Sequence, residues 1–179
     1  MDNCTKDVTL AAAFISDILT LYNGKSDQAA LKQMAAKYDL SNPMNQVPIQ
    51  VYNDMCQWVE SEIGEANTRL IGKKIGETAY QSMAAQKMIS ENPTPIEAME
   101  ALVKVASIMI QDPKNRGWEI AETDSKHIIM RRTQTFNSTL QLGLLEGLIR
   151  KTKVFSPQVS YLKQVSEGDE FDEYKIAWL

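Results

Sequence analysis

Residues 118–130 read WEIAETDSKHIIM, and in this stretch the spacing of the apolar residues differs from that in the residues before it. Apolar and polar side chains alternate over residues 118–122, which is the period of a half-buried strand. Residues 123–125 have the composition of a turn, and strand-forming side chains resume at His127. The stretch therefore predicts a β-hairpin, in a chain that reads as helix up to this point.

The residues before the hairpin follow the three- and four-residue spacing of amphipathic helices. Five helices are expected, at about residues 8–22, 26–38, 48–64, 65–90 and 95–111. The first two would form a helical hairpin within residues 1–40. The fifth has the most secure start, because Thr94, Pro95 and Glu97 combine a capping box with proline at the first helical position.

Two pairs of glycines interrupt apolar helix faces. Gly72 and Gly76 lie beside the apolar residues of the fourth helix, and their missing side chains predict that another element approaches closely. Gly143 and Gly147 belong to a further helix, at residues 138–151, and are expected to let that helix lie flat on the sheet.

Two more strands are expected after this helix, at about residues 159–165 and 174–178. The order of elements predicts an α+β fold, in which the helical N-terminal half packs on an antiparallel sheet of about four strands with one inserted helix. The length of 179 residues suits a single domain spanning residues 1–179.

Composition and charge exclude several classes of protein. The chain is 44% hydrophobic and 23% charged, as globular domains are, and its formal charge of -4 gives no footprint for nucleic acid or anionic lipid. No apolar run reaches the ~18 residues of a membrane span, and no basic segment opens the chain as in an export signal. We therefore expect no nucleic-acid partner, no membrane span and a cytoplasmic location.

The residues that often carry catalysis or metals are sparse. His127 is the only histidine and is interpreted as a packed or rim residue of its strand. Cys4 and Cys56 have no spacing that suits zinc or a disulfide, so both are expected to be free thiols. The chain is therefore predicted not to be an enzyme. Three carboxylates near the end of the third helix are interpreted as a solvated face: Glu60, Glu62 and Glu65.

Methionine side chains are adaptable and often fill apolar ligand sites. This chain has nine of them, and several lie on the predicted apolar faces of helices. The alternative interpretation is ordinary core packing. The candidate lining residues of an apolar pocket are Met83, Met99, Met109, Trp118 and Leu144.

The end of the chain resembles a known group of domains. Residues 143–147 read GLLEG, a strand follows, and residues 168–178 read GDEFDEYKIAW. This pattern, with an entry helix over residues 47–64, resembles the vinyl-reductase-type domains. Those domains share a ligand-binding fold with heme nitric-oxide-binding (H-NOX) domains and with TRAPP-type vesicle-tethering subunits. The resemblance covers residues 47–179 and implies this fold.

The chain departs from these relatives at the positions that bind cofactors. Phe171 and Asp172 stand where the vinyl-reductase group usually has cysteines. No predicted helix carries a histidine for heme iron, and residues 128–133 lack the Tyr-x-Ser-x-Arg motif that holds the heme propionates in H-NOX domains. The resemblance thus implies the fold and an apolar pocket, without heme, zinc or another cofactor.

Two functions remain. The first is non-catalytic sensing or binding of an apolar small molecule, and the second is a protein-interaction adaptor of the TRAPP-subunit type without a ligand. An enclosed apolar cavity of ~300 Å³ or more would favour the first, and a filled interior the second. A homodimer is expected in either case, because the apolar stripes at residues 48–64 and 95–111 exceed what one small domain covers, and because related folds pair through helices.

Overall fold

A computed structural model describes all 179 residues of the chain. It contains six α-helices: α1 Ala12–Leu21, α2 Gln28–Ala35, α3 Ile49–Glu62, α4 Glu65–Ala85, α5 Pro95–Met109 and α6 Ser138–Ile149. The strands are β1 Thr9–Ala11, β2 Gln46–Pro48, β3 Ile110–Gln111, β4 Trp118–Thr123, β5 His127–Arg132, β6 Gln158–Lys163 and β7 Asp172–Ala177. A short 3-10 helix spans Val165–Glu167. The predicted α+β class is confirmed.

The main sheet has four antiparallel strands in the order β4-β5-β7-β6. The hairpin predicted from residues 118–130 is present, with Trp118 paired to Arg132 at its open end and Thr123 to Ile128 near its turn. The helix α6 lies between β5 and β6 in the sequence, as expected for one helix inserted between two hairpins.

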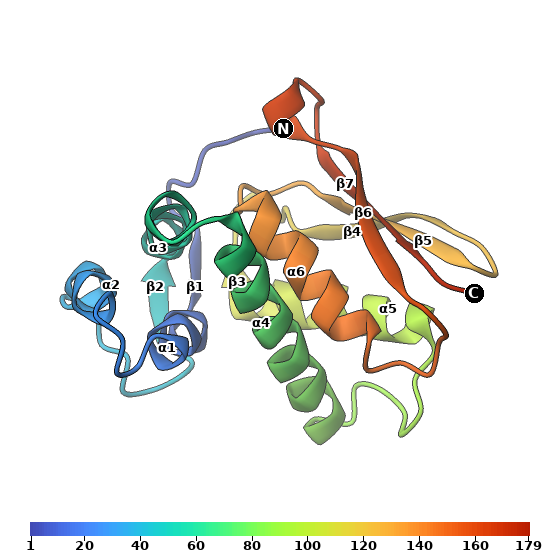
Figure 1. Ribbon diagram of the computed structural model, residues 1–179, viewed down its shortest axis with the longest axis horizontal. Coiled ribbons are helices and arrows are strands. Elements are labelled where there is room, and N and C mark those ends of the chain that lie inside the picture. Colours follow the sequence, from blue (N-terminus) through green and yellow to red (C-terminus); the bar gives the residue numbers. More distant parts are fainter.

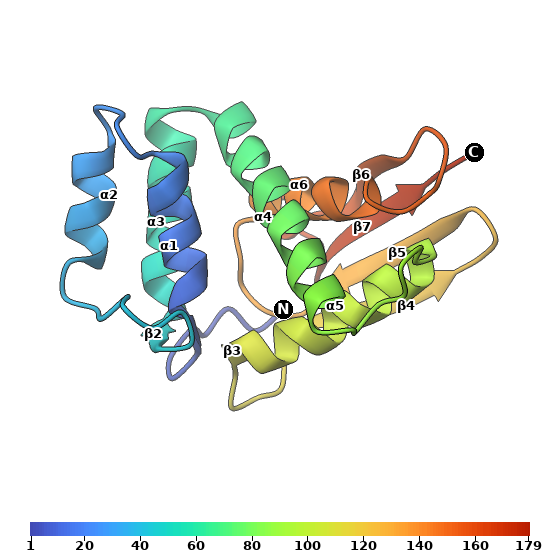
Figure 2. The same ribbon diagram turned by 90° about the horizontal axis from the view of Figure 1, so that it is seen from below.

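The helices form layers beside this sheet. Both α5 and α6 contact its strands, α4 packs along α6, and α1 and α3 contact α4 (Figure 1). Figure 2 shows α1, α2 and α3 gathered on the side of α4 that faces away from the sheet. Of the helices that precede the sheet in the sequence, α5 therefore packs directly on it, whereas α1, α2 and α3 lie further away, beyond α4.

A second, small sheet was not expected from the sequence. Its three short strands run antiparallel in the order β2-β1-β3, and Leu10 of β1 pairs with Val47 on one side and Ile110 on the other. The first helix consequently starts at Ala12 and not at residue 8. Strands of two or three residues are too short to show an alternating pattern, so they could not be predicted from the sequence.

The contact between α4 and α6 is made by backbone. Its glycines are Gly72 and Gly76 of α4, and Gly143 and Gly147 of α6. A Cβ atom at Gly72 would lie 2.1 Å from the carbonyl oxygen of Leu140, so no larger residue fits. The close approach predicted for the α4 glycines is confirmed, and α6 is the partner. The expected role of the α6 glycines was wrong, because they face α4 and not the sheet.

The ends of the helices agree with the sequence to within a few residues. The capping box of α5 is present, with Thr94 Oγ1 accepting from the backbone N–H of Glu97 at 3.3 Å. The helices are shorter than expected, most clearly α1, which starts at Ala12, α2, which spans only Gln28–Ala35, and α4, which ends at Ala85.

The chain buries most of both apolar stripes that had suggested a dimer, and Ile63, Ile96 and Val103 of them are partly exposed. Tyr52, Cys56 and Val59 of α3 are fully buried, as is Met99 of α5. One hydrophobic core contains residues of all six helices and of both sheets. Uncovered stripes are therefore no reason for dimerisation, and the homodimer rests on the resemblance alone.

Candidate functional site

An apolar cavity lies at the junction of the helices and the main sheet. Its volume is about 140 Å³, and 13 of its 18 lining residues are hydrophobic. They come from α1, α3, α4, α5, α6, β4 and β5 and the segments next to them. Thr78 and Ser82 of α4 are exposed and belong to the lining, which places the mouth of this apolar cavity along α4. The site is thus built from nearly every layer of the fold.

Three of the five residues proposed from the sequence line this apolar cavity: Met109, Trp118 and Leu144. Met83 and Met99 are completely buried in the hydrophobic core and do not line the cavity. Contact between the first three and a ligand stays a prediction.

Aromatic side chains form a large part of the wall. Phe14 of α1 meets Tyr52 of α3 edge to face at 5.9 Å between ring centroids, and Tyr52 meets Phe136 at 5.6 Å. Burial raises the pKa of Tyr52 well above its ordinary value, so its hydroxyl stays neutral. The sequence analysis missed these rings because they lie on three segments that only the tertiary fold brings together.

Arg132 at the end of β5 is the unusual residue of this wall. Its side chain is almost completely buried, with 1% of the residue exposed, and it lies over the rings of Trp118 at 5.1 Å and Phe136 at 4.3 Å. Its Nη2 donates to Gln134 Oε1 at 2.8 Å, whereas Nε and Nη1 have no hydrogen-bond partner. Burial lowers the pKa of Arg132 to about 10, which still leaves the guanidinium charged at neutral pH.

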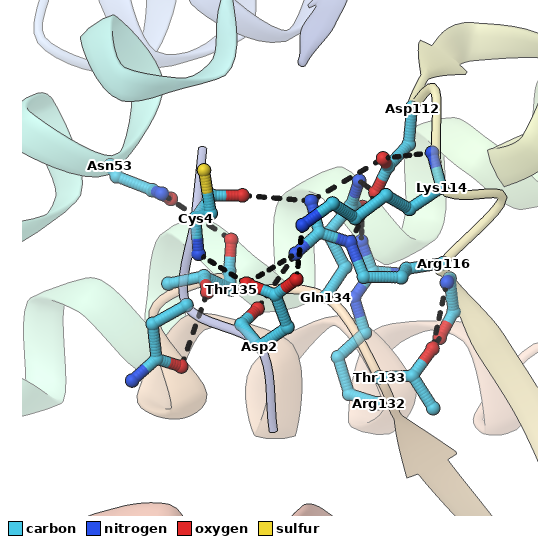
Figure 3. A network of polar contacts seen from close by, with 12 residues as sticks. Asp2, Cys4, Asn53, Asp112, Lys114, Arg116, Arg132, Thr133, Gln134 and Thr135 are labelled. Carbon is cyan, nitrogen blue, oxygen red and sulfur yellow. Dashed lines mark hydrogen bonds and ion pairs between the residues drawn. The ribbon is translucent and has the colours of Figure 1, made fainter. Parts of the chain in front are cut away.

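A chain of polar contacts leads from this guanidinium to the start of the protein (Figure 3). Gln134 donates to Asp112 Oδ2 at 2.8 Å, and Arg116 Nε donates to the same oxygen at 2.7 Å. Arg116 also donates to two carbonyl oxygens of the N-terminal segment, those of Asp2 and Cys4. Both carboxylates in this chain of contacts are paired with other cations, Asp112 with Arg116 and Asp2 with Arg116 and Lys114, and Arg132 has no ion-pair partner of its own.

A second cavity of about 140 Å³ adjoins the first. Only 4 of its 11 lining residues are hydrophobic, so we name it the polar cavity. It shares Ala106, Ile110, Trp118 and Arg132 with the apolar cavity. Arg132 and Trp118 thus stand where an apolar compartment meets a polar one.

The other candidate groups lie outside both cavities. His127 contacts two carboxylates at the tip of the hairpin, with Nδ1 2.7 Å from Asp124 Oδ2 and Nε2 3.1 Å from Glu122 Oε1, as expected of a rim residue. Both cysteines are free thiols, as predicted. Burial raises the pKa of the Cys56 thiol, so this thiol is not a nucleophile at neutral pH.

The interpretation of the carboxylates near the end of α3 was correct for two of the three. Glu62 and Glu65 are exposed. Glu60 is half-buried and accepts hydrogen bonds from Asn137 Nδ2 and from Thr139 Oγ1, the latter at 3.2 Å. It ties α3 to the start of α6, and the interpretation of Glu60 as solvated was wrong.

No group of three or more His, Cys, Asp or Glu side chains is arranged to hold a metal ion. None of the helices combines the length and the apolar composition that crossing a membrane requires.

The sequence matches no protein-family model and no curated protein. The structure, in contrast, is similar to solved H-NOX structures. An H-NOX protein from S. oneidensis has a TM-score of 0.73 at 9% identity, over 95% of this chain and 96% of that one. An H-NOX protein from K. algicida has a TM-score of 0.67 at 12% identity, over 95% and 97% of the two chains. An oxygen-binding H-NOX domain related to soluble guanylate cyclases has a TM-score of 0.63 at 14% identity, over 93% of this chain and 91% of that one.

Identities this low show the fold alone, and the chain has an H-NOX-like fold. The H-NOX part of the resemblance seen in the sequence is supported at that level. The vinyl-reductase and TRAPP parts stay predictions.

The residues of this chain do not fit the heme that H-NOX domains are described as holding. A cavity of about 140 Å³ has the size of the ~150 Å³ cavity that holds one benzene molecule, whereas a porphyrin has four linked rings. No helix that borders the cavity carries a histidine, and the one histidine of the chain lies at the hairpin tip, beside Asp124 and Glu122.

Proposed function

We propose that this protein is a non-catalytic domain that binds, and thereby senses, a small apolar molecule in the cavity between α4, α5, α6 and the main sheet. The observation that carries the proposal is the apolar cavity itself, because close-packed protein interiors contain few voids larger than a water molecule. The H-NOX-like fold supports it by analogy, since one relative of that fold is described as oxygen-binding.

The size of the cavity restricts the ligand. Its volume is about half of the ~300 Å³ that was expected to favour a ligand-binding domain, so that expectation is not met, although the interior is not filled as expected of the adaptor. A ligand of about one ring or one short branched chain fits, and a lipid or pigment does not. The Met109, Trp118 and Leu144 side chains are its proposed apolar contacts.

The adaptor of the TRAPP-subunit type is the competing function, and no observation of the structure favours it specifically. A homodimer and a cytoplasmic location remain part of the proposal as expectations carried over from the sequence. The proposal also includes the expectation that the protein has no enzymatic activity.

Benzene is the simplest probe of the apolar cavity. A ligand that binds only the folded state stabilises it by about 1.4 kcal/mol at ten times its Kd. We expect saturating benzene to raise the melting temperature of the full chain. The variant Ala106→Leu fills the cavity, because Ala106 lines it, and should remove this effect.

Ala101→Leu is the matched control. Ala101 lies on the same helix and is buried, but it does not line the cavity. It should lower stability through overpacking, by roughly 1–3 kcal/mol, and keep the benzene effect. No stabilisation of the natural chain by benzene or by any small apolar compound would contradict the proposal and leave the adaptor.

A further inference from the structure

The burial of Arg132 and its missing partners indicate the chemical class of the ligand. A buried charge is normally paired, because removing an ion from water costs several kcal/mol when no counter-ion replaces the lost hydration. Arg132 is buried and forms no ion pair, and two of its nitrogen atoms have no hydrogen-bond partner. An anion is therefore the group that this wall lacks.

The surroundings of the guanidinium do not supply that anion. The rings of Trp118 and Phe136 contribute cation–π contacts, which are weaker than an ion pair. The only polar partner is the neutral amide of Gln134. Asp112 lies one hydrogen bond further away, and Arg116 neutralises it.

A second orphaned group lies in the same wall. Gln141 of α6 lines the apolar cavity, is buried, and its Oε1 has no hydrogen-bond partner. Buried polar side-chain atoms nearly always have a partner, so both orphaned groups indicate a missing neighbour. The guanidinium nitrogens of Arg132 need an acceptor, such as a carboxylate, whereas Gln141 Oε1 can only accept and needs a donor, such as a water molecule.

The charge selects one kind of anion. One guanidinium carries one uncompensated positive charge, and a carboxylate carries one negative charge. A phosphate monoester carries up to two negative charges, so one of them would stay buried and unpaired. Asp17, the only acidic residue that lines the apolar cavity, repels any anion and repels a dianion more strongly than a monoanion.

We propose that the ligand is a monocarboxylate with an apolar body of about one ring, whose carboxylate pairs with Arg132 at the junction of the two cavities while its body fills the apolar cavity. This inference rests on the proposed function and names its ligand class. The polar cavity, which Arg132 and Gln134 also line, leaves room for water around the carboxylate.

The test compares two probes of the same size, benzoate and its neutral counterpart benzyl alcohol, by isothermal titration calorimetry on the full chain. A hydrogen bond to a charged group stabilises a complex enough to change affinity roughly 10-fold to 100-fold. We expect benzoate to bind at least 10-fold more tightly than benzyl alcohol. Phenyl phosphate serves as the dianion and should bind more weakly than benzoate.

Arg132→Met should remove the preference for benzoate and leave the affinity for benzyl alcohol within about 3-fold, because only the charge is lost. Arg132→Lys keeps the charge and should restore part of the preference. A benzoate preference that survives in Arg132→Met, or equal affinities for the two probes in the natural chain, would overturn the carboxylate inference alone. If neither probe binds but benzene still stabilises the chain, the carboxylate inference fails and the proposed function stands. If benzene has no effect either, the proposed function fails, and the inference fails with it.

Discussion

Arg132 carries an unpaired charge in the core, which is costly without a ligand. The cation–π contacts with Trp118 and Phe136 return about 0.5–2 kcal/mol each, less than the several kcal/mol that burial of a charge costs. A residue that lowers stability in this way is typical of a binding site, where function and stability conflict.

We therefore expect Arg132→Met to stabilise the ligand-free protein, by about 1–3 kcal/mol, because an apolar side chain of similar length replaces an uncompensated charge. Urea unfolding of the natural chain and the variant, both freed of ligand, measures the difference. Marked destabilisation would show that the aromatic contacts compensate the charge fully, which would remove the reason to infer an anion.

Asp172 gives a prediction about pH. Burial raises the pKa of this carboxyl above its ordinary value of 3.8, although the Val165 N–H donates to it at 3.0 Å. Because the folded-state pKa is the higher one, the stability contributed by the neutral form is complete below pH 3.8 and is lost as pH rises through the folded-state pKa. At neutral pH the ionised carboxylate is thus destabilising.

Asp172→Asn should accordingly raise the free energy of unfolding at pH 7 and leave it nearly unchanged at pH 3, since the amide oxygen still accepts from Val165. Asp169→Asn, in the exposed turn nearby, is the control and should have little effect at either pH. Urea unfolding at the two pH values measures both variants. Equal effects of Asp172→Asn at pH 3 and pH 7 would contradict a raised pKa of Asp172.

The sequence could not identify Arg132 as a site residue. Arginine is almost never fully buried, and Arg132 follows Arg131 in a strand, which reads as a pair of surface charges. Its burial depends on Trp118, which lies opposite on β4, and on Phe136 beyond the strand. Three lining residues could be identified because each is apolar and lies on a face that the sequence predicts to be buried: Met109, Trp118 and Leu144.

At the scale of elements, the α4–α6 contact is the most constrained part of the fold. A Cβ atom at Gly76 would lie 2.1 Å from the carbonyl oxygen of Leu144, so the helices would have to separate. We expect Gly76→Ala to destabilise the protein by at least 2 kcal/mol, in spite of the better helix propensity of alanine.

Gly117→Ala is the matched control, because nothing lies within 4 Å of a Cβ atom at Gly117. It should change stability by less than about 0.5 kcal/mol. Thermal unfolding measures both variants. Equal effects would mean that α4 and α6 are not in backbone contact.

Elements with a strong local signal were predictable from sequence. The α5 capping box, the alternating hairpin and the break at Asp112 and Pro113 each depend on neighbouring residues. The small sheet was missed because Leu10, Val47 and Ile110 become partners only after the chain folds. The glycines of α6 were assigned to the wrong neighbour for the same reason, since spacing shows a close approach but not its partner.

At the scale of the whole molecule, the expected homodimer is testable by light scattering at micromolar concentration. The chain mass is 20.1 kDa, and a species of twice that mass is expected. The apolar stripes of α3 and α5 do not support this expectation, because the chain itself buries most of both. A monomer would contradict the homodimer and leave the cavity proposal intact.

The central claim is that a small molecule occupies the cavity between the helices and the main sheet. Native mass spectrometry of protein purified from its own host tests it most directly. We expect the natural chain to carry an added mass on the order of 100 Da, released on denaturation as a monocarboxylic acid, and the Ala106→Leu variant to carry none. The bare 20.1 kDa mass for both proteins, or the same added mass on both, would contradict the claim.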